Sequence, residues 1–183
     1  MPQRPPAYPQ LRSRNRKGDI AELAFLAKAM RLGFNVCKPF NSDSRYDVLV
    51  EAAGRYSRVQ VKSTWVPPAG SSSNTYVVRI ARTPRGGQVF YRSDETDFFA
   101  AYVAPEDAWY IIPYKIVSHQ KVIALFPHKP HSRGRLETYR EAWDVFLPTG
   151  MAIVDLKAAA EISSAAPEDA SGDSAPSLCS GCE

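Results

Sequence analysis

Residues 46–63 read YDVLVEAAGRYSRVQVKS. Apolar and polar residues alternate in two runs, Tyr46 to Ala52 and Tyr56 to Ser63, on either side of Gly54. Such alternation is typical of strands with one buried face, and a glycine between two such runs is typical of a hairpin turn. We therefore expect an antiparallel hairpin in the middle of the domain.

The two faces of this hairpin differ in chemistry. A loop of four residues, Ala53 to Tyr56, would place Asp47 opposite Lys62 and Leu49 opposite Gln60 on one face. The other face is apolar and consists of Val48, Val50, Val59 and Val61. One face therefore fits a core, while the other gathers an acid, an amide and an amine, as a functional site does. The alternative is a solvated cross-strand ion pair between Asp47 and Lys62, which would contribute only about 0.2–1 kcal/mol.

A helix is expected to begin near Asp19 and to end at Gly33. Its apolar residues recur at helical spacing: Ile20, Leu23, Ala24, Ala27 and Met30. Glu22 lies among these apolar neighbours, so we expect it to be partly buried and to need a partner. The alternative is a capping box in which Asp19 is the N-cap and Glu22 lies in the first turn.

The remaining pattern predicts more strands and a second helix. Strands are expected at Phe34 to Phe40 and at Thr75 to Ala81, and a second hairpin at Asp97 to Val103 and Ala108 to Ile112. A helix is expected at Leu136 to Leu147. This order predicts an α/β (α+β) domain in which a mixed β-sheet is flanked by helices.

Charge divides unevenly along the chain. The net charge is +4, but residues 155–183 hold six acidic residues and one lysine, so residues 1–154 carry +9. We expect a flexible, basic, proline-rich arm at residues 1–15, a folded domain at 16–157 and a disordered acidic tail at 158–183. A basic domain attracts polyanions, of which nucleic acid is the commonest, although charge that only confers solubility is the alternative.

No apolar run approaches the roughly 20 residues of a membrane-spanning helix, and the N-terminal residues do not resemble a secretion signal. The three cysteines, Cys37, Cys179 and Cys182, are too few for a disulfide framework. We therefore expect an intracellular (cytoplasmic) protein without a membrane partner. Cys179 and Cys182 form a CxxC pair in a Ser/Gly/Ala-rich tail, for which zinc or redox roles are the weaker alternatives.

Three stretches together resemble a known family. They are Gly18-Asp19-Ile20-Ala21-Glu22, Tyr46-Asp47-Val48 and Val59-Gln60-Val61-Lys62-Ser63. In this order they resemble the PD-(D/E)XK nuclease superfamily, whose fold is restriction-endonuclease-like. Within it, they are most similar to the bacterial group I intron homing endonucleases, whose active site carries Gln at the third motif position. Asp97 to Tyr102 and Trp109 to Pro113 also resemble that branch, and the resemblance spans roughly residues 17–147.

The resemblance implies a metal-dependent DNA endonuclease with four catalytic residues: Glu22, Asp47, Gln60 and Lys62. Its ion would be Mg²⁺, with Mn²⁺ as a substitute, held by Asp47, Glu22, the Gln60 side-chain oxygen and the Val61 carbonyl, all hard oxygen ligands. Two positions depart from the family pattern. Tyr46 stands in place of proline, and Gln60 stands in place of an acid. Either the homing-type glutamine is tolerated, or the domain has lost catalysis.

Double-stranded DNA is the expected partner, and the resemblance implies a homo-oligomer that spans it. The expected phosphate contacts are Arg12, Arg14, Arg16, Lys17 and Arg45, with Arg79, Arg82, Arg85 and Arg92 as further candidates. Three alternatives to a sequence-specific homing-type enzyme remain open. They are a Holliday-junction resolvase or a restriction or repair nuclease of the same fold, a non-catalytic nucleic-acid-binding module, and a protein-interaction scaffold.

Overall fold

The computed structural model describes residues 13–41, 43–66, 75–82, 87–128 and 134–155. Several predictions lie outside these residues: those for the arm at 1–12, for Arg12 and Arg85, and for the acidic tail with Cys179 and Cys182. Among the helices in the described ranges, none has the length and apolar character needed to cross a membrane.

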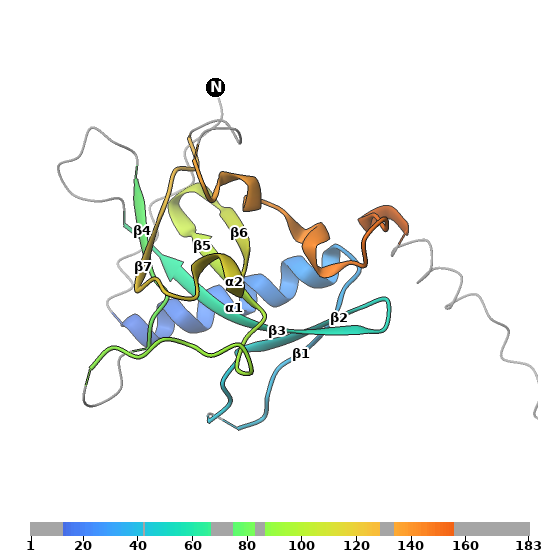
Figure 1. Cartoon of the computed structure of the whole chain (residues 1–183), viewed down its shortest axis with the longest axis horizontal. Helices are drawn as coiled ribbons and strands as arrows, with labels where there is room; N and C mark the ends of the chain where they lie inside the picture. Colours follow the sequence, from blue (N-terminus) through green and yellow to red (C-terminus); the bar gives the residue numbers. More distant parts are fainter. Residues whose placement is uncertain (1–12, 42, 67–74, 83–86, 129–133, 156–183) are drawn as a thin grey trace, which may run out of the picture.

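A five-stranded mixed sheet is the centre of the structure (Figure 1). Its strands, in spatial order, are β1 (Asn35–Cys37), β2 (Val48–Ala52), β3 (Arg55–Thr64), β5 (Phe98–Val103) and β6 (Ala108–Pro113). β3 and β5 are parallel, and the other neighbours are antiparallel. The predicted α+β class with a mixed sheet is confirmed.

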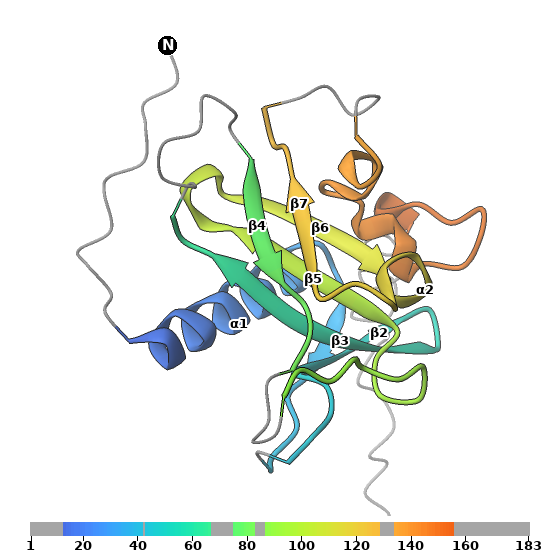
Figure 2. The ribbon, with the colours of Figure 1, turned by 60° about the vertical axis from the view of Figure 1, so that its left-hand side comes forward.

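Different elements cover the two faces of this sheet. One face carries α1 (Arg14–Arg31) and the short 3-10 helix η3 (Trp143–Phe146), which lies beside β2. A second 3-10 helix, η2 (Glu137–Tyr139), lies beside β6, and its Tyr139 packs in the core of the opposite face. The other face carries a two-stranded sheet of β4 (Tyr76–Arg79) and β7 (Val122–Leu125), which lies in front of β5 and β6 in Figure 2. A 3-10 turn, η1 (Ala104–Glu106), joins β5 to β6, and α2 (Tyr114–Val117) follows β6. Sequence analysis did not predict β7 or α2.

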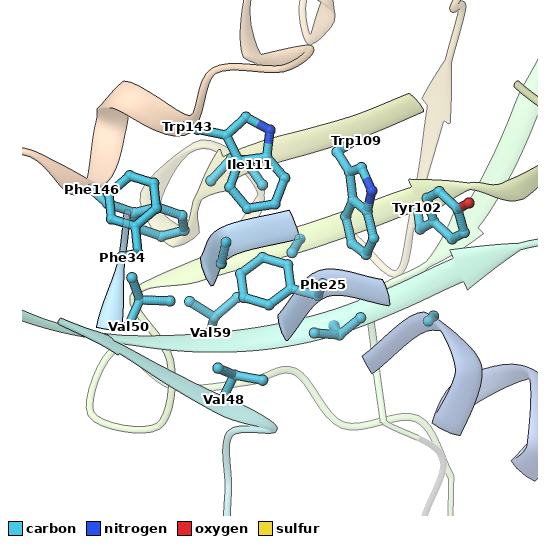
Figure 3. Close-up of a cluster of buried hydrophobic side chains, with 14 of the residues drawn as sticks. Phe25, Phe34, Val48, Val50, Val59, Tyr102, Trp109, Ile111, Trp143 and Phe146 are labelled. Carbon is cyan, nitrogen blue, oxygen red and sulfur yellow. The ribbon is translucent and has the colours of Figure 1, made fainter. Parts of the chain in front are cut away.

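Each layer has its own apolar core. Phe25 of α1 is fully buried beneath Trp109, Trp143 and Phe146, and the valines of β2 and β3 complete this core (Figure 3). Since Val48, Val50, Val59 and Val61 are all buried, their prediction as a core face is confirmed. On the opposite face, alternate residues of β5 and β6 pack against Tyr76, Val78, Ile123 and Leu125 of β4 and β7. Gln60 and Lys62 pair with Phe99 and Ala101 and so point toward this second layer.

A partly buried ion pair between Arg58 and Asp97 fixes where β5 joins β3. Arg58 donates its backbone N–H and its guanidinium to the Asp97 carboxylate at 2.8–2.9 Å, and Asp97 N–H donates to the Arg58 carbonyl at 2.9 Å. This hydrogen-bonded pair lowers the pKa of Asp97 despite its partial burial. Charge-assisted hydrogen bonds therefore stabilise the first contact between β3 and β5, just before the parallel pairing begins at Val59 and Phe98.

The register of the β2–β3 hairpin differs from the predicted one by two residues. The structure pairs Val48 with Val59 and Val50 with Ser57, so the prediction that Asp47 faces Lys62 is wrong. The cause is a two-residue turn, Ala53-Gly54, in place of the expected four-residue loop. Both turn residues have positive φ, +48° and +73°, which matches the right-handed twist of the flanking strands.

Two helix predictions need correction. The first helix begins at Arg14, not near Asp19, and its N-cap is Ser13, whose side chain accepts the Arg16 N–H at 3.4 Å. The capping box of Asp19 and Glu22 is therefore wrong, because both residues lie inside the helix. The residues before Ile20 are polar and basic, so a prediction based on the spacing of apolar residues could not detect the first turns of the helix.

The predicted helix at Leu136 to Leu147 is interrupted. Arg140 is extended and forms a bridge with Tyr110, and Glu141 has φ of +54°. Two hydrogen bonds of 2.8 Å join Glu141 to Trp109. The Trp109 N–H donates to the Glu141 carboxylate, and the Glu141 N–H donates to the Trp109 carbonyl. Pairing with the edge strand β6 thus replaces helical hydrogen bonds, which leaves only η2 and η3.

Ala53 offers a test of the turn. Replacing Ala53 with Asn should raise the free energy of unfolding by about 0.5–1 kcal/mol, because Asn tolerates the left-handed conformation better than Ala. Gly54→Ala should lower it by about 1–2 kcal/mol, through backbone strain alone, since no atom lies within 4 Å of the added Cβ. Urea denaturation measures both, and no effect from either substitution would contradict the assigned turn.

Candidate active site

Asp47 lies where the β2–β3 ladder ends. Its backbone N–H donates to the Val59 carbonyl at 2.9 Å, and its carboxylate Oδ2 accepts the Val61 N–H at 2.8 Å and the Gln60 side-chain amide. Both donors reach the same oxygen, so Oδ1 makes no hydrogen bond to any part of the chain that the structure describes. Asp47 Oδ1 is therefore open to a ligand at the point where β2 and β3 separate.

The charge of Asp47 is strongly influenced by its surroundings. Burial raises the pKa of this carboxyl to about 6, and the negative charge of Glu22 also raises it. The positive charges of Lys62 and Lys38 and the Val61 hydrogen bond oppose the increase. A partly desolvated carboxylate near a second acid favours a nearby cation.

Glu22 reaches the same groove from α1. Its carboxylate receives a 2.6 Å ion pair from Lys38, which follows β1, and the pair raises the pKa of Lys38. The expectation that Glu22 is partly buried and has a partner is confirmed, since its side chain is 21% exposed. Glu22, Lys38 and Asp47 line one groove of about 330 Å³ with residues of the loop between β1 and β2.

Lys62 stands two residues after Gln60 on β3. Burial lowers the pKa of its amine, while the charges of Asp47 and Glu22 oppose that decrease. Within the described residues, the amine makes no hydrogen bond or ion pair, so the alternative of an Asp47–Lys62 ion pair is wrong. The amine instead lies over the ring of Tyr91, 5.4 Å from its centroid.

A second groove, of about 390 Å³, opens beside Lys62. Its lining contains four cations, Arg14, Lys17, Lys62 and Arg79, together with Ser63, Trp65 and Ala81. The structure thus brings three of the predicted DNA-contacting residues next to the predicted catalytic lysine, although they come from α1 and β4.

Other predicted DNA contacts are separate from this groove or already paired. Arg16 is exposed on the first turn of α1. Arg82 donates to both oxygens of Glu95 at 3.0 and 2.9 Å, and Arg45 lies 3.7 Å from the same carboxylate. Arg92 pairs with Asp94 at 3.0 Å. These pairs reduce the charge that Arg45, Arg82 and Arg92 present to a polyanion.

Comparison with known proteins identifies the family. The sequence model for PD-(D/E)XK endonucleases matches residues 12–146, which is most of the described structure. The chain belongs to the PD-(D/E)XK endonuclease family. No curated protein sequence gives a significant match.

The solved structures that match this chain include a homing endonuclease and a Holliday junction resolvase. The bacterial homing endonuclease I-Ssp6803I is 31% identical, with a TM-score of 0.61 over 82% of this chain and 98% of that chain. The Holliday junction resolvase Hjc of Archaeoglobus fulgidus is 14% identical, with a TM-score of 0.38 over 61% of this chain and 84% of that chain. The predicted restriction-endonuclease-like fold and the resemblance to a bacterial homing endonuclease are confirmed.

The oxygen atoms of this PD-(D/E)XK site fit a divalent metal ion. Asp47 Oδ1 is open, Glu22 lines the same groove, and the Gln60 side chain adjoins Asp47. The Val61 carbonyl points to the same edge of β3 as its N–H, past the end of β2. All are hard ligands of the kind Mg²⁺ prefers. No group of three His, Cys, Asp or Glu side chains suited to a metal occurs in the described ranges, so the Gln60 side chain and the Val61 carbonyl would have to complete the ligand set.

Sequence analysis did not find three residues of this site. Lys38 lies within the predicted strand Phe34 to Phe40 and Trp65 lies just after the predicted strand Tyr56 to Ser63, but no pattern in the sequence assigned either residue to the site. Tyr91 lies between β4 and β5, in a segment without a periodic pattern. Only the packing of distant segments brings Lys38 to Glu22 and Tyr91 to Lys62, whereas Trp65 follows Lys62 on the same segment.

Proposed function

We propose that this protein is a metal-dependent, sequence-specific DNA endonuclease of the homing type. The observation that carries the proposal is the position of Asp47. Its carboxylate joins Gln60 and Val61 at the fork of β2 and β3, beside Lys62 and a groove lined by cations. Membership of the PD-(D/E)XK family and similarity to a bacterial homing endonuclease support it.

Asp47, Glu22, Gln60 and the Val61 carbonyl would hold Mg²⁺, for which Mn²⁺ would substitute. The bound ion would lower the pKa of a water ligand and offset charge on the phosphate. Lys38 holds one carboxylate oxygen of Glu22, Oε2, so the other oxygen, Oε1, would bind the ion. Lys38 lies in the same groove, where its charge would attract DNA phosphate.

Lys62 would act on the scissile phosphodiester. Its amine is not engaged by an acid, so it can orient the attacking water or accept its proton, and in its charged form it stabilises the developing negative charge. Burial lowers the pKa of this amine, which makes it a better proton acceptor than an exposed lysine. Gln60 would hold Asp47 in position through its amide and orient water.

The groove beside Lys62 would receive the DNA backbone. Arg14 and Lys17 lie in the first turn of α1, which contains no acidic residue. Cations at the positive end of a helix each cost about 0.3–1 kcal/mol of stability. Their cost is offset if this end binds an anion, because backbone N–H groups and cations then point at the same phosphate. Double-stranded DNA is the proposed substrate, bound by a homo-oligomer inside the cell.

Substituting the central residues tests catalysis. Asp47→Asn and Lys62→Met should each reduce the rate of Mg²⁺-dependent DNA cleavage by at least about 10²-fold, with folding and DNA binding retained. Glu51→Gln on β2 and Lys115→Met on α2 serve as controls and should cleave like the wild type. The readout is single-turnover cleavage of a DNA library with sequencing of the ends.

The same experiment separates the alternatives. Recurrent ends from the wild type alone would support a sequence-specific enzyme. If four-way junction DNA is added as a parallel substrate, its cleavage in preference to linear duplex would support a resolvase. DNA binding without cleavage by any variant would contradict the proposal and favour a non-catalytic module with Gln60 in an inactive site.

The cationic groove can be tested by salt dependence. The slope of log K against log salt should become shallower by about one unit in each of Arg14→Gln, Lys17→Gln and Arg79→Gln, because each removes one phosphate contact. Arg55→Gln, an exposed substitution at the tip of the β2–β3 hairpin, is the control and should leave the slope unchanged. Equal slopes in all four variants would contradict the assignment of this groove to DNA.

A further inference from the structure

We infer that Tyr91 is a positioning residue that holds the Lys62 amine at the active site through the face of its ring. The inference rests on the proposed function for the role of Lys62. The contact itself is a feature of the structure, in which Lys62 Nζ lies 5.4 Å from the centre of the Tyr91 ring. This separation lies within the range of a cation–π interaction.

Lys62 needs such a partner. A lysine amine ends a flexible four-carbon chain, and hydrogen bonds or ion pairs usually restrict it. Lys62 has neither within the described residues, and Asp47 directs Oδ2 to Gln60 and Val61 instead. The ring of Tyr91 is therefore the contact that can restrict where the amine lies.

Tyr91 is itself held rigidly. It is 6% exposed, and its ring packs edge-on against Phe99 with centroids 5.4 Å apart. The Tyr114 hydroxyl donates to the Tyr91 carbonyl at 3.0 Å. The backbone just before it is fixed by the paired hydrogen bonds of Arg82 and Val89, both at 3.0 Å.

Arg82 gives the ring a second cation. Its guanidinium carbon lies 4.8 Å from the ring centre, and Glu95 holds the guanidinium with two hydrogen bonds. Glu95 also accepts the Arg92 N–H at 2.9 Å, which fixes the carboxylate relative to the same segment. Arg82, one of the candidate DNA contacts, is therefore assigned to support Tyr91 from inside the protein.

The catalytic test compares substitutions that keep or remove the ring. Tyr91→Phe should keep kcat within about threefold of the wild type, whereas Tyr91→Leu should lower kcat by at least about tenfold, with KM and DNA affinity unchanged, because misplacing a reacting group lowers the rate of the chemical step. Tyr56→Leu removes an exposed tyrosine from the same strand as Lys62 and should have no effect. Wild-type kcat in Tyr91→Leu, or equal losses in Tyr91→Phe and Tyr91→Leu, would overturn the inference.

A second measurement does not depend on cleavage. Lysine amines are reductively methylated with a ¹³C label, and Lys62→Arg identifies the signal of Lys62 by its loss. The ring should shift that signal upfield of the methylated surface lysines in the wild type and in Tyr91→Phe. A Lys62 signal at the ordinary position would overturn the inference even if Tyr91→Leu does not fold. If the wild type gives the upfield signal but cleaves no DNA, the proposed function fails while the contact stands.

Discussion

The hydrogen bond from the Val61 amide to the Asp47 carboxylate is the interaction on which the site depends. It lies where the β2–β3 ladder stops, so a side-chain oxygen takes the place of a strand carbonyl. An amide buried at this edge without an acceptor would be costly, and Asp47 supplies the acceptor. The same bond orients the free carboxylate oxygen of Asp47 on the side of β3 to which the Val61 carbonyl also points. One hydrogen bond therefore completes the end of the strand pairing and positions the oxygen atoms of the proposed metal site.

The sheet around the point where β2 and β3 separate is buried on both faces. Phe25 and the valines of β2 and β3 form one core, while β4 and β7 cover β5 and β6 on the other face. Gln60 and Lys62 point into the second layer, so burial lowers the pKa of Lys62. Glu22 and Lys38 approach Asp47 from α1 and from the loop after β1, at the open end of β2. Glu22 and Asp47 thus line one groove at the end of β2.

The alternation of apolar and polar residues in residues 46–63 predicted much of the central sheet, because in a strand it indicates directly which face is buried. It predicted the valine face, the hairpin, and the position of Gln60 and Lys62 on the opposite face of β3. It could not predict the register, since the two-residue turn places Ala53 in a conformation that Ala rarely adopts. It could not predict the break at Glu141 either, because that residue bonds to Trp109, which is 32 positions away. Tyr91 and Lys38 reach the site only through such distant contacts.

The central claim is that Asp47 and its neighbours form a metal site, and anomalous X-ray scattering from crystals grown with Mn²⁺ tests it most directly. The account predicts an anomalous peak in contact with the Asp47 carboxylate and the Val61 carbonyl, which is lost in Asp47→Asn. A peak elsewhere in the protein and none at Asp47, in crystals of a protein that cleaves DNA with the same ion, would contradict it.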